Sequence, residues 1–573
     1  MTADLIRRRD YEPAVASQLH EHPLLGRLLA SRGIAHADEL ELQLKHLPQP
    51  GSMRDFNVAV ELLVKAVTSA RKILIIGDYD ADGATSTALA CHVLRRLGAL
   101  VDYLVPSRFK FGYGLSPEIV EVALQKNPQV LLTVDNGIAS VSGVEAARQA
   151  DLSVIVTDHH LPPLQLPAAD ALVNPNRVDC EFPGKNLCGV GVIFYVMSGL
   201  CRALQQNGWL ESKNLETPRM ADYLDLVAVG TVSDVVPLDR FNRILVEQGV
   251  RRIRAGHARP GVLALFEVAS RPHRYATADD LGFIVGPRLN AAGRLDDMSV
   301  GVDCLLAEDI ASALPFAREL DQLNRSRRQI ESGMRADAEE QVNAVLAVQS
   351  GELPSALVLY QPDWHEGVIG IVAGRVKEQC HRPVFAFAKA ADGMLKGSGR
   401  SVAGVHIRDI LMAMVASQPA LLAKFGGHAM AAGATIAESS VVQFRQAFIA
   451  EVDRVLDGKR LQREWLTDGA LNDDEMSLAN AALVKYLQPW GQAFPFPTFD
   501  NDFEIRDVRI VGNGHSKLVL RRVGGKRDIP AVAFNRVIES VGQQVWRVVY
   551  RLDVNRYRNT ESLQLMVDYM EPA

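Results

Sequence analysis

The stretch KILIIGDYDADGATSTALA at residues 72–90 decides the fold of this chain. Its apolar, β-branched run at 73–76 predicts a buried strand, and the small residues at 84–90 predict the helix that follows. The carboxylates between the strand and the helix are Asp78, Asp80 and Asp82. They lie at the carboxyl end of a strand, where open α/β sheets bind their ligands. Like charges held this close need a counter-charge, and carboxylate oxygens suit Mg²⁺ or Mn²⁺.

The pattern D-x-D-x-D-G also opens the calcium loop of an EF-hand. That loop needs Glu at its twelfth position, and counting from Asp78 places Leu89 there. The segment before the loop has the pattern of a strand rather than that of a helix. The sequence therefore disfavours a calcium loop, while a solvated acidic turn without any metal remains an alternative for this stretch alone.

Polar groups recur after three further apolar stretches, and we interpret these stretches as strands. Taken alone, an Asp after a strand is usually a turn or a helix cap, and a His pair is usually surface or satisfied core. Recurrence at successive strand ends instead favours one shared metal site. The groups are Asp135-Asn136 after 130–134, Asp158-His159-His160 after 154–157, and Asp234 after 231–233.

In chain order, DYDADG, VDNG, TDHH and GTVSDVVPL resemble the motifs of the DHH phosphoesterase family. GPRLNAAGR, GSGRS and FGGHAMAAG continue the match and are similar to motifs of the bacterial single-stranded-DNA exonucleases in that family. The resemblance covers nearly the whole chain. It implies a metal-dependent 5′-to-3′ exonuclease that hydrolyses single-stranded DNA to 5′ mononucleotides in recombination and repair.

Two other functions remain open. A DHH phosphodiesterase of short oligonucleotides or small nucleotides is the first, although a small substrate needs no additional basic β-rich region. A non-catalytic nucleic-acid scaffold on the same fold is the second, although it should have lost metal ligands that this chain retains.

The resemblance also implies roles for the acidic and histidine residues. Two divalent ions, Mn²⁺ or Mg²⁺, would activate a water molecule and stabilise the leaving oxygen. Asp158 would orient a neighbouring histidine, and His160 would contact the scissile phosphate or assist proton transfer. Asp78 would ligate an ion directly or lie in the layer around the ligands. The implied ligands are Asp80, Asp82, Asp135, His159 and Asp234, with Asp135 bridging the ions.

Composition sets wider limits on the function. The 573 residues suggest three or four domains, and 48% hydrophobic with 23% charged residues is ordinary for a soluble protein. The net charge of −6 neither indicates nor excludes nucleic-acid binding, because local basic surface governs phosphate contacts. The six cysteines form no CxxC pattern, which favours reduced thiols in the cytoplasm. We expect no signal peptide, no membrane span and a monomer.

The order of strand and helix patterns predicts an α/β protein whose largest part is a doubly wound, mainly parallel sheet. Small helices between 20 and 70 should cap this sheet, and a long helix should contain Pro315 in a first turn capped by Ser312. CGVGVIFYVM at 188–197 predicts a tight turn opening a buried helix rather than a dinucleotide site. The expected parts are a cap at 1–50, a DHH domain at 51–305, a connecting helix at 306–350, a smaller α/β DHHA1 substrate-binding domain at 351–457 and an OB-like β-barrel at 464–573.

Two groups in the first domain are candidates for substrate binding. The loop PSRFKFGYG presents Arg108 and Tyr113, which could hold a phosphate and stack on a base; a Gly-rich turn over a packed aromatic ring is the alternative. Arginine side chains of GPRLNAAGR could clamp a phosphate, or could pair with Asp296 or Asp297 instead. The candidates from this second motif are Arg288, Asn290 and Arg294.

The later parts add an anion nest and a basic platform. Ser398, Arg400 and Ser401 provide the components of an anion nest, and Gly427 and His428 are expected to contact phosphate or sugar. Residues 501–573 contain 12 Lys and Arg against 9 Asp and Glu, as single-strand binding favours. The resemblance alone implies a single-strand-binding protein and a helicase as partners. The expected platform consists of Arg521, Arg522, Lys526, Arg527, Arg556, Tyr557 and Arg558.

Overall fold

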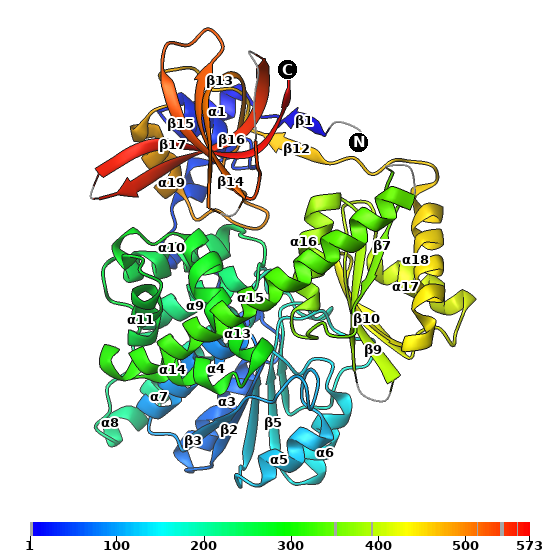
Figure 1. Cartoon of the computed structure of the whole chain (residues 1–573). Helices are drawn as coiled ribbons and strands as arrows, with labels where there is room; N and C mark the ends of the chain where they lie inside the picture. The colour runs from blue at the N-terminus through cyan, green and yellow to red at the C-terminus, as the bar shows by residue number, and fades with distance from the viewer. Residues whose placement is uncertain (1–3, 349–351, 391–392, 513, 539–543, 559) are drawn as a thin grey trace. The chain divides into compact units, whose positions relative to one another are not determined.

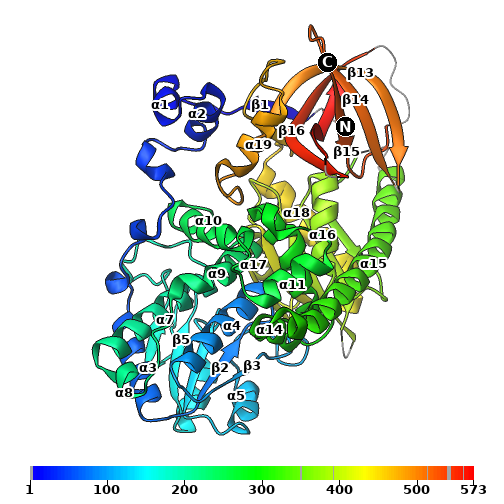
Figure 2. The ribbon, with the colours of Figure 1, turned by 90° about the vertical axis from the view of Figure 1, so that its left-hand side faces the viewer.

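A computed structural model describes residues 4–348, 352–390, 393–512, 514–538, 544–558 and 560–573 (Figures 1 and 2). The chain forms two compact units. One unit comprises Arg8–Leu323 and Leu466–Ala573, and the other comprises Asn324–Trp465 with the first residues up to Arg7. Among the described residues, none of the helices combines the length and the apolar composition that a membrane span needs.

A five-stranded parallel sheet organises the first unit and confirms the predicted doubly wound domain (Figure 1). Its spatial order is β3-β2-β4-β5-β6, so the chain reverses direction across the sheet beside β2. In such sheets the ligand site lies at the carboxyl ends of the strands near this reversal. The strands are β2 (Ile73–Gly77), β3 (Val101–Leu104), β4 (Val130–Val134), β5 (Ser153–Thr157) and β6 (Ala171–Val173).

Helices cover both faces of this sheet because successive side chains of a strand point to opposite sides. Ile73 and Ile75 of β2 belong to the large core that α3, α4 and α7 complete. Leu74 and Ile76 point the other way, into a smaller core with α5 and α6. The helices are α3 (Phe56–Thr68), α4 (Ala81–Arg96), α5 (Pro117–Leu124), α6 (Val141–Gln149) and α7 (Gly189–Gln206).

A helical region follows the sheet along the chain. One of its elements, α9, corrects an interpretation made above: Leu224–Ser233 is a helix and not a strand, so Asp234 follows a helix end. A short π-helix, η6 (Leu281–Val285), leads into the GPRLNAAGR motif. The elements are α8 (Trp209–Ser212), α9 (Leu224–Ser233), α10 (Arg240–Arg254), α11 (Pro260–Val268), α12 (Ala278–Asp280), η6, α13 (Gly286–Leu295) and α14 (Ser299–Leu306).

His92 on α4 makes the stability of this unit dependent on pH. Its Nε2 lies 3.0 Å from the Leu305 carbonyl oxygen, and burial lowers its pKa from 6.5 to about 4. The unfolded chain therefore binds more protons than the folded one between these values, so stability should fall as the pH decreases from about 6.5 to about 4. We expect His92→Gln, which retains an N–H donor, to remove about 2 kcal/mol of the loss between pH 7 and pH 5.

Urea denaturation at pH 5 and at pH 7 measures the effect. His36→Gln, at an exposed position, is the matched control and should leave the difference between the two pH values unchanged. An equal pH dependence for wild type and His92→Gln would show that the ring is not kept neutral by burial.

The C-terminal region is a closed five-stranded barrel with the order β13-β14-β15-β17-β16, which confirms the predicted OB-like fold. Tyr550 and Phe503 lie in its core, and α19 (Leu478–Leu487) packs against it. The strands are β13 (Phe499–Val511), β14 (His515–Arg522), β15 (Asp528–Ala533), β16 (Val545–Tyr557) and β17 (Thr560–Pro572).

The N-terminal helices differ from the expected cap on the sheet. Leu24, Leu25 and Leu28 of α2 (Pro23–Ala30) are buried in the barrel core, although Leu29 faces the core of the sheet domain. Arg32, which follows α2, also contacts the C-terminal region: its guanidinium donates two hydrogen bonds, of 2.8 and 2.9 Å, to the buried Asp468 carboxylate. Most of the buried face of α2 therefore belongs with the barrel.

The second unit contains a five-stranded mixed sheet with the order β10-β11-β9-β8-β7. α17 and α18 cover one face, where Phe385, Phe387, Phe444 and Phe448 form an aromatic core. The elements are β7 (Leu357–Tyr360), α16 (Ile369–Cys380), β8 (Val384–Lys389), β9 (Met394–Arg400), α17 (Ile407–Ser417), β10 (Lys424–Gly427), β11 (Ala431–Ala437) and α18 (Val441–Leu456).

The long helix α15 (Ile310–Val348) runs from one unit into the other, as the sequence predicts. Asp309, rather than Ser312, caps its start: the Asp309 carboxylate accepts a 2.7 Å hydrogen bond from the Ser312 backbone N–H. Pro315 therefore lies beyond the first turn. Its buried residues include small and apolar ones, such as Ala317 and Met334, and the polar Asp321, Asn324 and Arg327.

Candidate metal centre

The loop between β2 and α4 holds the first three carboxylates at the carboxyl edge of the sheet. Asp80 is the N-cap of α4, and its carboxylate accepts a 3.0 Å hydrogen bond from the Gly83 backbone N–H. A Cβ atom at Gly83 would lie 2.4 Å from the Asp78 carbonyl oxygen, so only glycine allows the loop to fold back this tightly. Asp78 is consequently buried beside Asp80 and not directed into solvent.

Asp82 is fixed by the start of α7, a contact that the sequence does not reveal. The backbone N–H groups of Gly189 and Val190 donate hydrogen bonds of 2.6 and 2.8 Å to its carboxylate. The first N–H groups of a helix have no partner inside the helix and carry a partial positive charge, so they stabilise an anion. The tight CGVGV turn therefore orients an acidic residue.

Asp135 follows β4 in a left-handed backbone conformation, with φ at 63°. Its N–H donates to the Thr157 carbonyl of the neighbouring strand at 3.0 Å. Asn136 locks the turn by donating to the carbonyls of Ile76 and Val134 at 3.0 and 2.9 Å. Asp135 thus lies between the ends of β2 and β5, as an ion-bridging ligand must.

Asp158 follows β5 and organises the two histidines. Its Oδ1 accepts hydrogen bonds from the backbone N–H groups of His159 and His160, and it lies 2.8 Å from His160 Nδ1. Its Oδ2 accepts from the Ile138 N–H at 2.8 Å. Both oxygens of Asp158 are therefore occupied, one of them by His160, and its orienting role stays a prediction.

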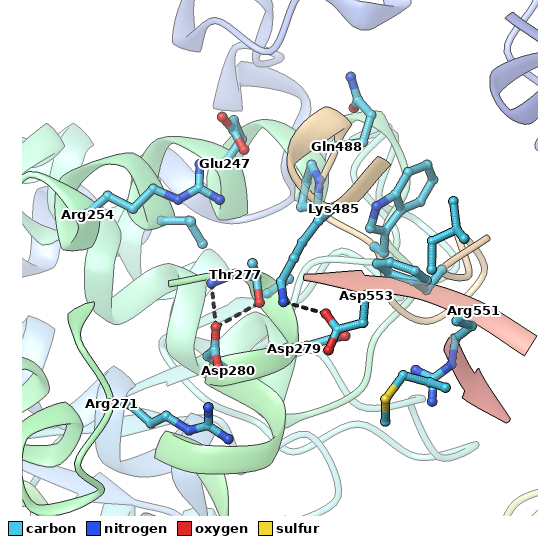
Figure 3. A pocket seen from close by; sticks show the side chains of 17 residues that line it. Glu247, Arg254, Arg271, Thr277, Asp279, Asp280, Lys485, Gln488, Arg551 and Asp553 are labelled. Carbon is cyan, nitrogen blue, oxygen red and sulfur yellow. Dashed lines mark hydrogen bonds and ion pairs between the residues drawn. The ribbon is translucent and has the colours of Figure 1, made fainter. Parts of the chain in front are cut away.

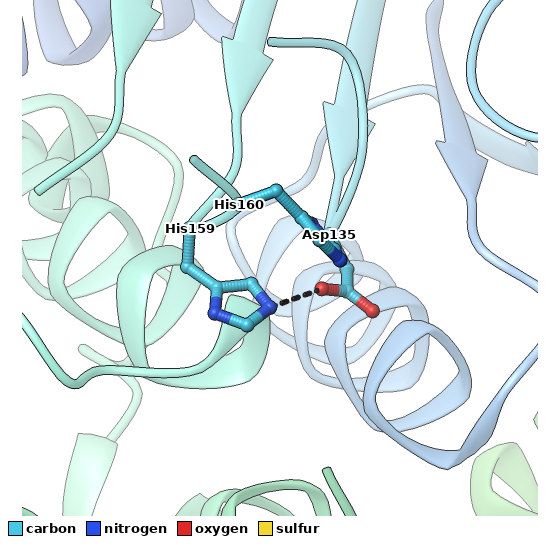
Figure 4. Close-up of side chains that lie close together, drawn as sticks. All are labelled: Asp135, His159 and His160. Carbon is cyan, nitrogen blue, oxygen red and sulfur yellow. Dashed lines mark ion pairs between the residues drawn. The ribbon is translucent and has the colours of Figure 1, made fainter. Parts of the chain in front are cut away.

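His159 points toward the Asp135 carboxylate (Figure 4). Its Nε2 lies 3.2 Å from Asp135 Oδ1, 3.5 Å from Asp234 Oδ2 and 3.9 Å from Asp82 Oδ2. Asp234 reaches this point from the C-terminal end of α9 rather than from a strand. Four segments that are far apart in the sequence therefore converge on one imidazole nitrogen.

The electrostatics of the cluster call for a cation. Burial and the mutual repulsion of the acids raise the pKa of Asp82 to about 7 and place those of Asp78, Asp135 and Asp234 well above their usual range. Burial lowers the pKa of His159 to about 4, so its ring stays neutral and offers a lone pair. A divalent cation would reverse these effects by stabilising each carboxylate as an anion.

Orphaned polar atoms test whether a metal ion fits. Asp135 Oδ1 and His159 Nε2 are both buried without a hydrogen-bond partner, which is costly unless another ligand satisfies them. Oxygen and imidazole donors suit Mn²⁺ and Mg²⁺. Three sets have ligand atoms within 4.8 Å of one another: Asp78, Asp80 and Asp135; Asp82, His159 and Asp234; and Asp135, His159 and His160. Asp135 belongs to two of these sets, and the three sets together contain every predicted ligand and also His160.

His160 has a different environment from His159. Burial alone would lower its pKa, but its bond to Asp158 and the nearby negative charges raise the pKa to about 9. Its ring is therefore protonated at neutral pH. The Tyr113 hydroxyl lies 2.9 Å from His160 Nδ1, so the loop at 106–114 reaches the cluster.

The basic part of that loop also lies beside the acidic loop. The Arg108 guanidinium lies 4.8 Å from the centre of the Tyr79 ring, in a cation–π contact. Tyr79 in turn packs edge-on against Tyr113. The structure thus brings Arg108 and Tyr113 to the metal centre, where they could reach a bound phosphate.

The GPRLNAAGR motif supports the centre from the other side. Asn290 Oδ1 accepts a 2.9 Å hydrogen bond from the Ala81 N–H, and so holds the acidic loop. Arg288 pairs with Asp321 at 2.8 Å. Arg294 exerts its charge on Tyr79. The sequence of this motif predicts a phosphate clamp. In the structure, Asn290 and Arg288 have intramolecular partners, so their contact with substrate stays a prediction.

Gly189→Ala tests the approach of α7 to the cluster. A Cβ atom at position 189 would lie 2.5 Å from both Cβ and Oδ1 of Asp135, so one side chain must move. We expect a 10- to 100-fold weaker affinity for Mn²⁺, about the effect of disturbing the groups that orient metal ligands. Isothermal titration with Mn²⁺ measures this affinity.

Gly191→Ala is the matched control in the same helix. Its Cβ would meet only the Leu187 side chain, at 3.2 Å, so Mn²⁺ affinity should be nearly unchanged. If Gly189→Ala bound Mn²⁺ as tightly as Gly191→Ala does, Asp135 would not be held in place by α7.

The remaining candidates in the second unit lie together on two paired strands. Arg400 donates to Ser398 Oγ at 3.0 Å, and the Ser401 hydroxyl donates to the Val405 carbonyl at 2.6 Å. β11 pairs with β9 so that Ala431 lies opposite Arg400. The turn before β11 contains His428, whose N–H donates to the Ala431 carbonyl at 2.8 Å, and Gly427, with φ at 141°. The structure thus places these candidates close together, and their binding of an anion stays a prediction.

The barrel cations form two groups at opposite ends of α19. At its start, Arg522 pairs with Asp473 at 2.6 Å and the Arg527 guanidinium donates to the Met476 carbonyl. At its end, Arg556 pairs with Glu561 at 2.7 Å and lies over the Tyr275 ring. Arg521 pairs with Asp528, Lys526 is exposed, and Tyr557 and Arg558 contact each other at the exposed β16–β17 turn.

A cavity of about 220 Å³ lies between the barrel and the helical region of the same unit (Figure 3). Its charged walls are largely paired: Lys485 contacts Asp553 at 2.8 Å, and Asp280 accepts a 2.8 Å hydrogen bond from the Thr277 N–H. None of the residues that line it belongs to the carboxylate cluster. The cavity is therefore separate from the candidate metal centre.

With the geometry established, the class of protein follows. Residues 72–231, which contain the parallel sheet and the acidic segments from Asp78 to Asp158, match the model of the DHH family N-terminal domain, and the DHHA1 domain model matches 353–457. The fold and the site define a phosphoesterase of the DHH type. A third model, the RecJ OB domain, matches 467–569.

Comparison with characterised proteins narrows the class. The chain is 48% identical over 571 residues to the single-stranded-DNA-specific exonuclease RecJ of Escherichia coli, covering 99% of each chain, and equally identical to RecJ of Haemophilus influenzae. The crystal structure of Thermus thermophilus RecJ with Mn²⁺ superposes with a TM-score of 0.79 at 28% identity, covering 99% of this chain and 79% of that one. The chain belongs to the RecJ family.

Proposed function

We propose that this protein is a metal-dependent exonuclease that hydrolyses single-stranded DNA in the 5′-to-3′ direction and releases 5′ mononucleotides. The observation that carries the proposal is the buried cluster in which Asp135 Oδ1 and His159 Nε2 lie 3.2 Å apart without hydrogen-bond partners. The names of the full-length relatives, single-stranded-DNA-specific exonucleases, support the substrate.

Asp80, Asp82, Asp135, His159 and Asp234 would hold two divalent ions, and Asp78 would complete the set. When bound, the ions supply Lewis-acid chemistry, which lowers the pKa of water and neutralises charge on the phosphodiester. The titles of Thermus RecJ structures with Mn²⁺ and with Mg²⁺ support this choice of metals.

The protein's own residues would position the substrate and move a proton. Asp158 accepts the proton on His160 Nδ1, which leaves the proton on His160 Nε2 to donate to the leaving 3′ oxygen or to a phosphate oxygen. Tyr113 would restrain the same ring through its hydroxyl. Arg108 and Arg294 would bind phosphate oxygens near Tyr79.

The second unit and the barrel would supply further contacts with the strand. Ser398, Arg400, Ser401, Gly427 and His428 would bind a phosphate, since they combine hydroxyl groups, a guanidinium and a glycine-rich turn. The exposed barrel group of Lys526, Tyr557 and Arg558 would bind the strand farther along, with the paired arginines beside it. Arg288 and Asn290 would act from beneath the site.

The same proposal extends to the cellular setting. DNA as substrate and six free cysteines favour a cytoplasmic monomer. A single-strand-binding protein or a helicase would provide the substrate by exposing unwound ends, and roles in repair and recombination follow from the same substrate.

Digestion of a long single strand labelled at either end, with the duplex and a short oligonucleotide alongside, tests the function. With Mn²⁺ or Mg²⁺ we expect early release of the 5′ label and a spared duplex, and no release with EDTA. Early release of the 3′ label would overturn the polarity. Activity confined to the short oligonucleotide would identify a phosphodiesterase of small substrates.

A further inference from the structure

The C-terminal end of α9 has an unusual backbone residue beside the metal centre. Asp234 is the C-cap of this helix, and Val235 follows it in the left-handed conformation, with φ at 61°. Glycine is the usual residue at this position because it has no Cβ to clash. Among the described residues with positive φ, Val235 is the only β-branched one.

Other helices of the same unit show which residue types occupy the position after the C-cap. The corresponding residues after α4, α7 and α10 are Gly98, Gly208 and Gly256, while Ala70 follows α3 and Ser270 follows α11. These are glycines or small side chains. A branched side chain at this position is strained, so its retention calls for a reason other than the turn.

Packing does not provide that reason. The Val235 side chain is 62% exposed, so little apolar surface is buried in return for the strain. The connection from α9 to α10 is fixed by other groups: the Pro237 carbonyl accepts from Asn242 at 2.8 Å, and the Leu238 N–H donates to Gln492. The fold would accept glycine or asparagine here.

We propose that Val235 is a substrate-contacting residue, whose strained backbone presents an isopropyl group to the sugar or base of the nucleotide bound beside Asp234. Asp234 Oδ2 lies 3.5 Å from His159 Nε2, which places Val235 one residue from the candidate centre. The sugars and base faces of all four nucleotides offer apolar surface, so the contact is independent of sequence. The inference rests on the proposed exonuclease function and on Asp234 as a ligand.

Two substitutions test the contact without adding strain. Asn and Gly both tolerate the left-handed region, and Asn also retains a Cβ atom. For Val235→Asn and Val235→Gly we expect KM for single-stranded DNA to rise by about 5- to 20-fold, since apolar contact is lost. We expect kcat within about threefold of wild type, unchanged Mn²⁺ affinity, and a Tm equal to or above that of wild type.

Ser270→Gly is the matched control, because it makes the same backbone change at the end of α11 and should leave KM and kcat unchanged. A lower Tm for Val235→Asn and Val235→Gly would assign the side chain to packing and overturn the proposal. A fall in kcat with weaker Mn²⁺ binding would instead make Val235 a positioning residue for Asp234, and unchanged KM would exclude the contact. A wild-type protein inactive on single-stranded DNA would refute the proposed function itself, and this inference with it.

Discussion

Asp135→Asn should reduce kcat by about a thousandfold or more and, in the metal-free protein, raise the Tm. Asp135, like His159, belongs to two of the ligand sets, so its loss should affect both ions and remove several kcal/mol of transition-state stabilisation. Without metal, the same carboxylate is buried and repelled by Asp82, Asp80, Asp78 and Asp234, which raise its pKa. An uncharged amide of equal size relieves that repulsion.

Thermal unfolding with EDTA and with Mn²⁺, together with single-strand digestion, measures both effects. Wild type should be stabilised by Mn²⁺, because a ligand that binds only the folded state raises its stability. Asp135→Asn should lose most of that shift. Asp225→Asn is the control. Asp225 is also a buried carboxylate of this unit with a raised pKa, but it accepts a hydrogen bond from the Arg259 backbone N–H. An Asp135→Asn protein that is stabilised by Mn²⁺ as strongly as wild type would contradict the bridging role.

His160→Gln should lower kcat by about 10²- to 10⁴-fold, the usual contribution of a positioned proton donor. Asp158 and Tyr113 both contact Nδ1 of His160, so the orientation of the imidazole ring and of its proton is fixed. Mn²⁺ affinity should change by less than about tenfold, because the other ligands remain. Rapid-quench digestion under single-turnover conditions measures the chemical step.

Asp158→Asn provides an independent test of the same arrangement. Like His160→Gln, it should lower kcat, although His160 is still present, because the imidazole loses the carboxylate that orients it. Activity of His160→Gln within tenfold of wild type would remove His160 from proton transfer and assign it to the metal ligands.

The sequence predicted the sheet well because its strands carry a strong local signal. The runs at 73–76, 130–134 and 154–157 are short, apolar and followed by polar turns, which is typical of buried parallel strands. The segment at 224–233 has the same composition, rich in valine and leucine, and it is a helix. Composition alone does not separate a buried strand from a buried helix, and this segment is apolar on every side.

The site was predicted less completely because its supports are distant in sequence. Every expected metal ligand reaches the cluster, whereas the bonds from Gly189 and Val190 to Asp82 span more than 100 residues. The two glycines of CGVGV were the available signal, and they were interpreted as a turn. The sequence likewise predicts a substrate contact for Asn290, whereas in the structure its Oδ1 accepts a hydrogen bond from the Ala81 N–H.

The barrel shows the limit of counting charges. An excess of basic residues predicted a platform, but neighbouring acids pair with Arg521, Arg522 and Arg556. Pairing depends on strand register and on the loop at 472–476, which the sequence pattern does not specify. The remaining exposed cations are fewer than the sequence suggested.

The burial of Leu24, Leu25 and Leu28 in the barrel has a consequence for synthesis of the protein. The ribosome makes α2 near the start of synthesis and β17 at the end. These leucines therefore stay without their barrel partners until nearly the entire chain has been synthesised. Contacts of such long sequence separation form slowly, and exposed apolar surface favours aggregation in the meantime. Nascent chains stalled before residue 499 should therefore engage chaperones through their N-termini, whereas the sheet domain can already be folded.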